Sequence, residues 1–447
     1  MRTGPHPPLA RRPARTRRQR RAAWFAGLLV LALGLCAPAA KAQLLSSFFP
    51  EGVPGYGAAP GVTVRSRLRP GYEPLGARLD ALTIRPQVNF SFGYDDNIFG
   101  GAGRRGAWRA SASPSVLAGI ARAGVDIGLY ASADDVRYLN APAQNRADGA
   151  VFLGGTLPVG RDKLTLGAGY LTRHQDRSEL DALPSDRPVA FRVANLRAAY
   201  ASEFGRLTAT PSFELNRWRF GDTSVFGVPV TQTTRDRTTA QGAVTLRWSW
   251  MPGRDLLVMN RVLDTRYDRP AFGQASNNST AWQTMIGMDY DANTLWRYRF
   301  AGGVEYRESA SPSIPPTTTG ILEAELTWLP TGLTTVRANA TRGVEDAAQS
   351  GQSSFTYTSA SLTLDHEYLR DVLLNASASL RHAAFNRTGG QQLGLALGAG
   401  VTWMIDRHIR MSLTYDRADI RNLRLPPGRV AGDYSRDLGL LTLRLGL

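Results

Sequence analysis

The chain is dominated by stretches in which apolar and polar residues alternate with a period of two. Such stretches cover 82–94, 296–307, 322–328, 393–406 and 409–416. Because successive side chains of a strand point to opposite faces, each stretch predicts a strand with one apolar and one polar face. Several runs reach about 10 residues, the length that a tilted strand needs to cross a bilayer, whereas ordinary strands average roughly five or six. The pattern therefore predicts an all-β protein with membrane-length strands.

Tight turns and longer polar connections alternate between these strands. Tight turns are predicted at 122–124, 160–162, 204–206, 252–254, 291–293, 330–332, 369–371 and 406–407. Longer connections are predicted at 173–188, 221–235, 270–279, 309–319, 345–355 and 419–433. The turn spacing of roughly 40 residues accommodates two membrane-length strands and one long loop. Short periplasmic turns and long external loops are the usual asymmetry of outer-membrane barrels.

The number of strands predicts the architecture. Residues 81–447 contain about 18 strand patterns, with a range of 16 to 18, which indicates a transmembrane up-and-down antiparallel β-barrel. An even number places both ends of the barrel on the periplasmic side. A barrel of roughly 16 to 18 strands leaves an aqueous channel, unlike an eight-stranded barrel that side chains fill. The pattern therefore predicts a pore.

A soluble β-sandwich is the alternative, because its strands alternate as well. Tryptophan placement favours the membrane barrel: five of the nine Trp residues lie next to tight turns, where an interfacial belt would be. In a soluble protein we would expect Trp in core centres, away from turns. The predicted membrane-interface aromatic residues are Trp248, Trp250, Trp296, Trp328 and Trp403.

The first 42 residues have the pattern of a secretory signal peptide. Eight arginines precede an apolar stretch at 22–37, and Ala40-Lys41-Ala42 provides a small-x-small cleavage site. An N-terminal helical anchor is one alternative, and a lipoprotein modified at Cys36 is another, although Leu35 is a poor fit to a lipobox. Signal cleavage indicates export, here to the outer membrane of a Gram-negative bacterium.

Removal of this leader changes the charge balance. The formal net charge of +16 comes from 53 basic and 37 acidic residues, and nine basic residues lie in the leader. The mature chain therefore has 44 basic and 37 acidic residues, a net charge of +7. The remaining basic residues are spread along strands, which argues against a nucleic-acid partner. The single cysteine is also in the leader, so no disulfide is expected.

Residues 43–80 differ from the rest of the mature chain. They are rich in Pro and Gly and have no sustained period, which predicts an irregular segment. We expect it to be either a periplasmic extension or a plug that folds into the lumen.

Enzymatic chemistry has little support in the sequence. The four histidines outside the leader, at positions 174, 366, 382 and 408, have no metal-ligand spacing. No residue pattern selects a nucleophile with its base. We therefore expect no catalytic residues, no metal and no cofactor.

Charged residues occupy the polar phase of many strands and are the candidate pore-lining residues. They are Arg85, Arg247, Arg297, Arg299, Arg307, Glu323, Glu325, Arg337, Asp365, Glu367, Arg381, Arg410 and Arg444. One hypothesis is that the arginine excess favours anionic solutes, because rings of charge bias the passage of ions. The other is that arginines and carboxylates pair across neighbouring strands and stabilise a wet lumen.

The stretch 93–99 (Gly-Tyr-Asp-Asp-Asn-Ile-Phe), with the alternating strand before it, resembles the start of the family called putative β-barrel porin 2. The resemblance extends over roughly 82–447. It implies an outer-membrane barrel, and some members resemble barrels encoded with surface-polysaccharide export systems. The alternating leucines at the C-terminus are typical of an assembly signal, although Leu447 stands where Phe is usual.

Together these patterns predict a porin-like passive channel for small hydrophilic solutes. Its expected partners are outer-membrane lipid and the outer-membrane assembly machinery. The alternative is a barrel with an occluded lumen that serves polysaccharide export. Aromatic residues fall mostly in the outward phase of the strands, which favours the general pore over a lumen that stacks sugars.

Overall fold

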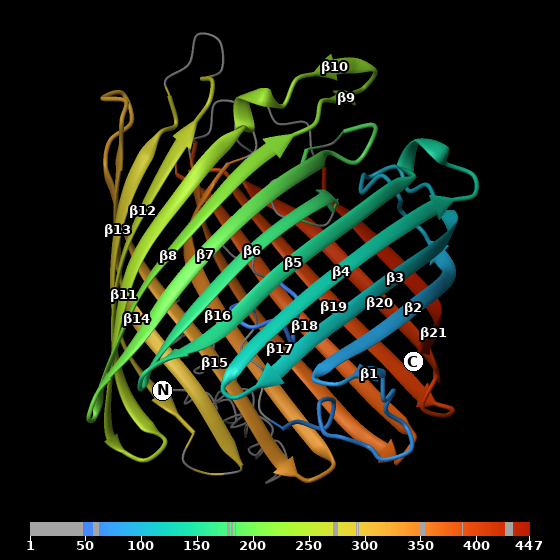
Figure 1. Ribbon diagram of the computed structural model, residues 1–447. Helices are drawn as coiled ribbons and strands as arrows, with labels where there is room; N and C mark the ends of the chain where they lie inside the picture. Colours follow the sequence, from blue (N-terminus) through green and yellow to red (C-terminus); the bar gives the residue numbers. More distant parts are fainter. Residues whose placement is uncertain are drawn as a thin grey trace, which may run out of the picture. The chain divides into compact units, whose positions relative to one another are not determined.

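The computed structural model describes residues 48–56, 62–176, 179, 182–183, 185–270, 276–291, 293, 295–347, 354–386, 388–424 and 432–447. The predicted signal peptide at 1–42 lies outside the described residues. Residues 38–447 form one compact unit, and its strands close into a barrel (Figure 1). Among the described residues, no helix is long and apolar enough to span a membrane.

The barrel wall consists of antiparallel strands that follow one another around the barrel in chain order. They are β2 (Leu82–Asp95), β3 (Ala107–Arg122), β4 (Val125–Tyr138), β5 (Arg146–Val159), β6 (Asp162–His174), β7 (Ala190–Phe204), β8 (Leu207–Phe220), β11 (Arg237–Met251), β12 (Arg254–Tyr267), β13 (Ser279–Tyr290), β14 (Trp296–Ser309), β15 (Thr317–Thr331), β16 (Thr334–Asp346), β17 (Ser354–Leu369), β18 (Val372–Phe385), β19 (Gln391–Met404), β20 (Ile409–Arg424) and β21 (Tyr434–Gly446). A short hairpin of β9 (Thr223–Val225) and β10 (Val228–Val230) lies in the connection between β8 and β11.

The barrel closes where the first wall strand pairs with the last. β2 pairs with β21 from Gln87 opposite Gly446 to Asp95 opposite Leu438. The sheet has 19 strands, but the short β1 (Ala77–Leu79) pairs only with β2, so the closed wall has 18. The predicted fold class and strand number are therefore confirmed.

Beyond the end of β21, β1 takes over as the neighbour of β2. The Leu447 N–H donates to the Pro86 carbonyl, and the Gly76 N–H donates to the Leu447 carbonyl. These bonds satisfy backbone groups that the shorter β21 would leave unpaired, which an edge inside a membrane cannot tolerate.

Short and long connections lie at opposite ends of the barrel, as predicted. The short turns include those at Gly160 (φ 65°) and Gly205 (φ 63°), where the left-handed backbone favours glycine. The long connections also include those at 96–106, 139–145 and 386–390. We call the two ends the short-turn end and the loop end.

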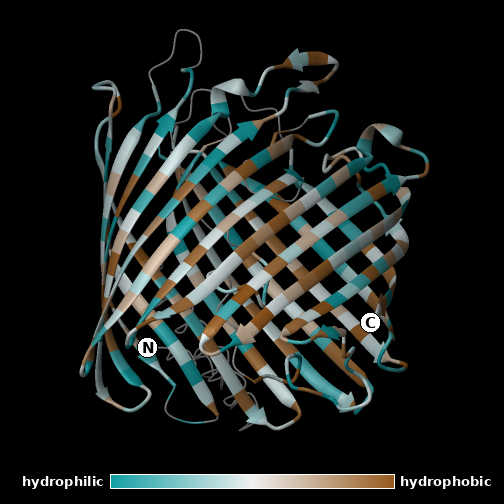
Figure 2. Ribbon diagram, in the orientation of Figure 1, coloured by the Kyte–Doolittle hydropathy of each residue, from teal (hydrophilic) through white to brown (hydrophobic). Residues whose placement is uncertain are grey.

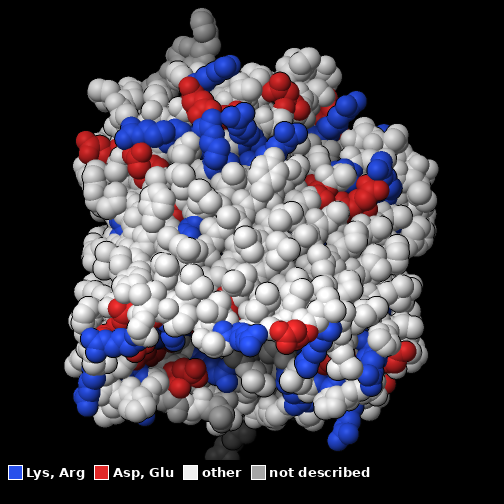
Figure 3. All heavy atoms as spheres, in the orientation of Figure 1, with Lys and Arg blue, Asp and Glu red and all other residues white. Residues whose placement is uncertain are grey.

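Alternation along the strands gives the wall its two faces. On β14, Phe300 and Val304 are exposed on the outside, whereas Ala301 and Glu305 on the inward phase are buried. Figure 2 shows the resulting alternation of hydrophobic and hydrophilic residues along the strands of the wall nearest the viewer. On the face seen in Figure 3, charged side chains gather in two bands near the barrel ends, with a broad, almost uncharged belt between them. This belt is the expected lipid-facing surface of an outer-membrane barrel.

Candidate functional site

The lumen of the barrel contains the inward-facing side chains and is the candidate functional site. Every predicted pore-lining residue occupies the strand phase opposite to the lipid-facing apolar side chains. Arg247 and Arg297, for example, alternate with Trp248 and Trp296, which are exposed on the outside. Strand register therefore places the predicted set on the inner face of the wall.

Most predicted pore-lining arginines are held by carboxylates on the same wall. Arg247 lies 2.8 Å from Asp255 and 3.3 Å from Asp289, which also binds Arg299 at 2.7 Å. Three further ion pairs are Arg261–Glu323 at 2.7 Å, Arg297–Asp291 at 3.0 Å and Arg337–Asp365 at 3.0 Å. Such pairs cancel much of the charge that a solute would otherwise meet.

The deepest of these networks surrounds Glu305, which is 1% exposed. Arg307 lies 3.1 Å from Glu305 and 3.0 Å from Asp346, and Arg237 lies 3.3 Å from the same Asp346. The Gln283 amide donates to Glu305 at 2.9 Å. Buried charges need partners to offset the cost of their burial. We therefore interpret this network as one that stabilises the wall rather than one that binds a solute.

The remaining predicted pore-lining residues have different surroundings. Arg85 and Glu325 form no hydrogen bond or ion pair with another described residue. The Arg444 Nε donates to Asn89 at 3.0 Å. Arg381 interacts electrostatically with Glu179 of the β6–β7 connection. The hypothesis that arginines and carboxylates pair across neighbouring strands thus describes the wall from β11 to β17. Elsewhere among the described residues, individual predicted residues such as Arg85 do not form such pairs.

An irregular segment lies inside the barrel; we call residues 48–56 and 62–76 the inner segment. Its first part packs against the inner faces of β5 and β7 through aromatic side chains. The Tyr56 and Phe152 ring centroids are 4.9 Å apart, and those of Phe48 and Phe191 are 6.0 Å apart. Arg197 lies 4.8 Å from the centre of the Phe49 ring. Cation–π contact and apolar burial together hold this part in the lumen.

Glycines on the inner wall make room for this part of the inner segment. A Cβ at Gly154 would come within 2.0 Å of the Pro54 carbonyl oxygen, and one at Gly128 within 2.8 Å of the Pro54 ring. A Cβ at Gly167 would meet the Tyr56 ring at 2.8 Å. The segment therefore approaches the wall more closely than any larger residue would permit.

The second part of the inner segment is anchored near the short-turn end by charge. The Arg67 and Arg69 guanidinium groups both donate to Glu367 on β17, with Arg69 at 2.7 Å. The Val64 N–H donates to the Thr335 hydroxyl at 2.9 Å. Glu367, one of the predicted pore-lining residues, lies on the inward phase and holds the inner segment.

A further anchor joins the inner segment to β20. Arg410 donates to the Tyr72 carbonyl at 2.8 Å and to the Glu73 carboxylate at 2.9 Å. The inner segment thus contacts the wall at β4–β7, at β16 and β17, and at β20.

Most aromatic side chains of the wall lie on the outward phase, as expected, and a smaller group lies in the lumen. Phe152, Phe191, Trp218 and Phe220 form this inward cluster on β5, β7 and β8. The physical reason is the inner segment, since its own Phe and Tyr rings need apolar partners. Strand alternation could not reveal why these aromatic residues face inward, because the inner segment that covers them has no regular period.

The connection between β6 and β7 also reaches into the lumen. Its Asp176 accepts a hydrogen bond from Arg436 on β21 at 3.3 Å. Glu179 of the same connection is partly buried, and desolvation followed by the charge of Asp176 raises its pKa to about 7, against a smaller effect of Arg381. The described residues of this connection thus bring carboxyl groups to the opposite side of the barrel from β6.

The stretch that carried the family resemblance closes the barrel at the loop end. Asp95 is buried and accepts from Arg436 at 2.7 Å and from the Tyr138 hydroxyl at 3.1 Å. The Asn97 amide donates to the Ser435 carbonyl at 2.9 Å. These side chains fasten β2 to β21, and the described residues contain no His, Cys, Asp and Glu group suited to a metal ion.

The predicted interface tryptophans lie close to the short turns. Trp296 and Trp328 are cross-strand neighbours on the outer face and stack with ring centroids 5.1 Å apart. Trp248 and Trp403 are exposed on the same face, whereas Trp250 lies within a register shift between Ser249 and Met251 at the end of β11. Trp108 and Trp282 near the loop end are also exposed, but they were not predicted, because the prediction was limited to Trp residues beside tight turns.

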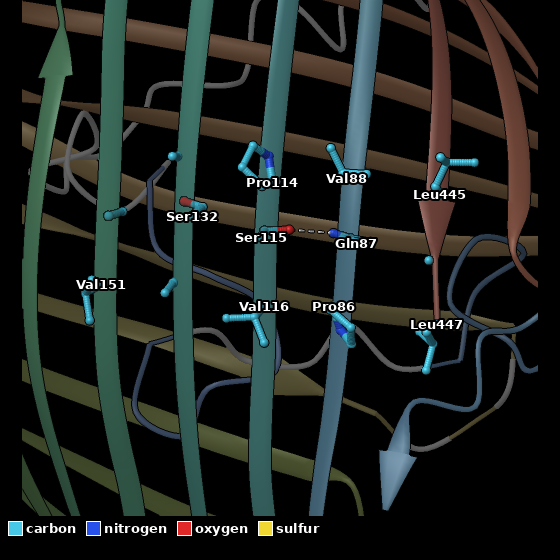
Figure 4. Close-up of a pocket in the computed structure, with 14 residues that line it drawn as sticks. Pro86, Gln87, Val88, Pro114, Ser115, Val116, Ser132, Val151, Leu445 and Leu447 are labelled. Atoms are coloured by element: carbon cyan, nitrogen blue, oxygen red, sulfur yellow. Dashed lines mark hydrogen bonds between the residues drawn. The ribbon is translucent and has the colours of Figure 1, made fainter.

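A shallow groove lies on the outer face beside the β2–β21 closure. Pro114 on β3 pairs with Val88, but the β3–β4 register has a gap at this position, because proline cannot donate to a strand neighbour. Figure 4 shows Pro86, Val116 and Leu445 among the residues that line this groove. Its lining is mainly apolar, and it belongs to the lipid-facing surface.

Two inward arginines escaped the sequence analysis. Arg109 on β3 and Arg146 on β5 occupy the inward phase near the loop end, and neither forms a hydrogen bond or ion pair with another described residue. Arg109 lies near the start of β3, where small residues follow it. Because these residues differ little in hydrophobicity, the sequence did not show which face of the strand Arg109 occupies. The position of Arg109 next to Trp108 could have indicated the inward phase, because Trp108 faces outward and neighbouring residues of a strand face opposite sides.

Comparison with known proteins gives a family and a set of similar folds. The sequence model of a family described as putative β-barrel porin 2 matches residues 69–445. A search of curated proteins found no match.

The chain is also similar to several solved structures, at low sequence identity. OccK1 (OpdK) of Pseudomonas aeruginosa is 14% identical with a TM-score of 0.44, over 83% of this chain and 100% of that one. OccAB3 of Acinetobacter baumannii is 10% identical with a TM-score of 0.43, over 83% and 100%. A bacterial polysaccharide outer membrane secretin is 11% identical with a TM-score of 0.36, over 81% and 98%.

Proposed function

The chain belongs to the putative β-barrel porin 2 family and forms a porin-like barrel in the Gram-negative outer membrane, and we propose that it is a passive channel for small hydrophilic solutes, narrowed by its inner segment. The observation that carries this proposal is the polar inner wall of an 18-stranded barrel with the inner segment anchored across it. A barrel of this size without an internal obstruction would have a wide aqueous channel. The inner segment and the β6–β7 connection reduce that width, so the channel passes small solutes.

Export of a polysaccharide is the less favoured alternative. A lumen that conducts a sugar chain would present open aromatic faces for stacking. Here Phe152 and Phe191 are covered by Tyr56 and Phe48 of the chain itself. The inner segment would also have to leave the lumen before a polymer could pass.

Single-channel recording in planar bilayers tests the proposed channel. The refolded protein should show a small conductance in KCl, and deletion of residues 43–76, which keeps β1, should raise it several-fold. The reason is that conductance follows the open cross-section of a wet pore. Heat-modifiable migration in gels would show that both proteins are folded barrels. Absence of conductance from both folded proteins would contradict the proposal.

A point variant provides a test that leaves the chain length unchanged. Glu367→Gln removes the carboxylate that holds Arg67 and Arg69, so trypsin should cleave after Arg67 in the folded barrel, whereas the Arg69–Pro70 bond resists trypsin because proline follows the arginine. Glu325→Gln is the matched control, because Glu325 is also inward but contacts neither arginine. Equal protection from trypsin in both variants would show that this ion pair does not anchor the inner segment.

A further inference from the structure

The lumen contains a polar cavity of about 320 Å³ beside the two unpaired arginines. Its lining comes from β3, β5 and the β18–β21 wall, and from the β6–β7 connection. The side chains that matter here are Arg109, Arg146, Ser377, Ser379, Asp416 and Arg436. Arg109 and Arg146 place one side of this cavity near the loop end of the barrel.

Arg109 and Arg146 have the character of a prepared anion site. Neither guanidinium has a hydrogen-bond or ion-pair partner among the described residues, and the Nε of Arg109 is buried without one. Arg109 also experiences the positive charges of Arg146 and Arg436. Partly buried cations that repel each other and lack partners are costly, unless an anion binds between them.

Arg436 differs from the other two because it is already neutralised. It lies 2.7 Å from Asp95 and 3.3 Å from Asp176. Its role is therefore to fix the cavity wall, whereas Arg109 and Arg146 keep free donors. The electrostatic neighbour Asp134 accepts from the Ser113 hydroxyl at 2.6 Å and forms no ion pair with Arg109.

The far wall of the cavity limits which anion fits. Ser377 and Ser379 on β18 offer hydroxyl groups, and Asp416 on β20 offers a carboxylate. A second negative charge in the ligand would be repelled by Asp416, whereas a hydroxyl group could donate to it. A guanidinium fork binds a planar carboxylate through two parallel hydrogen bonds.

We propose that this cavity binds small monocarboxylates that carry hydroxyl groups, with Arg109 and Arg146 on the carboxylate and Ser379 and Asp416 on the hydroxyl groups. This site rests on the proposed channel function, because it would concentrate such solutes along the permeation path. Binding itself does not require conduction. The two proposals can therefore fail separately.

Calorimetric titration of the detergent-solubilised full-length barrel with gluconate tests the site. We expect saturable binding in the millimolar range, weakened at least about tenfold in the Arg109→Gln/Arg146→Gln variant. The charge-matched control Arg65→Gln/Arg78→Gln removes two arginines of the N-terminal region away from the cavity, and it should bind gluconate as the unmodified protein does. Arg146→Lys keeps the charge but loses the fork, so it should bind several-fold more weakly.

Two further probes identify the ligand chemistry. Sorbitol, which has the hydroxyl groups but no carboxylate, should not bind, and inorganic phosphate should bind more weakly than gluconate. Equal loss of binding in both double variants would overturn the site, since only overall charge would then matter. Tighter binding of phosphate, or binding of sorbitol, would overturn the assignment to monocarboxylates. Gluconate binding by a protein without conductance would retain the site and refute the channel.

Discussion

Pairing determines which charged side chains in this lumen can meet a solute. On β11–β17, arginines such as Arg299 and Arg307 are neutralised by carboxylates within about 3 Å, so they contribute little net field. Arg85, Arg109 and Arg146 have no such partner among the described residues. Any preference for anions therefore depends on a few residues near β2–β5, and counting arginines on strands overestimates it.

Glu179 predicts a dependence of the channel on pH. In the folded protein the pKa of Glu179 is about 7, above the ordinary value of 4.5. Between pH 4.5 and 7, Glu179 therefore keeps its proton while the β6–β7 connection lies in the lumen and loses it when the connection moves out. The inward arrangement is therefore fully stabilised below pH 4.5 and loses this stabilisation as pH rises to about 7. Asp176 opposes ionisation, whereas Arg381 favours it. Release of the β6–β7 connection from the lumen would widen the channel. Conductance should therefore rise roughly twofold between about pH 5 and pH 8.

Variants separate this effect from other titrations. Glu179→Gln should abolish the rise, and Glu203→Gln, at the short-turn end of β7, should preserve it. An unchanged pH profile in Glu179→Gln would assign the effect to another group.

At the scale of elements, contacts between the inner segment and β5 depend on glycine. Gly154→Ala places a methyl group where the Pro54 carbonyl lies, so it should displace residues 52–56, raise conductance and cost about 1–3 kcal/mol of stability. Gly149→Ala on the same strand is the matched control, because its nearest contact would be an ordinary 3.6 Å. Denaturant unfolding and single-channel recording measure both effects. Identical behaviour of the two variants would show that the inner segment does not press on this wall.

The wall strands could be predicted from sequence because their determinants are local. Each strand needs only its own alternation, and each short turn needs only its own Gly, Asp or Asn, as at Gly160. The inner segment could not be placed in this way. Arg69 meets Glu367 across 298 positions of sequence, and no periodic pattern records such a contact. For the same reason the ion pairs between Glu367 and the inner segment could not be predicted from the sequence.

At the scale of the whole molecule, the lipid-facing belt determines where charge is tolerated. Ile286 on β13 is 65% exposed and lies between aromatic residues Trp282 and Tyr290 on the outer face. Ile286→Arg should destabilise the barrel by about 2–4 kcal/mol, because the charge would lie in hydrocarbon. Val228→Arg in the β9–β10 hairpin, at a site 63% exposed, should change stability by less than about 0.5 kcal/mol. Urea titration in lipid vesicles measures both, and equal costs would mean that β13 does not face the membrane.

The β2–β21 closure also constrains the order of folding. It joins residues such as Ser91 and Thr442, which are 351 positions apart, so the ring cannot shut until the last strand has been made. Contacts of such separation form slowly. The inner segment precedes β2 in the chain, yet it ends up surrounded by the wall. It must either settle on the open sheet before the ring shuts, or enter through the short-turn mouth afterwards. In the first route, the aromatic cluster around Phe152 would form a template on which the sheet curls, and maturation would then begin from the enclosed part rather than from the enclosing wall.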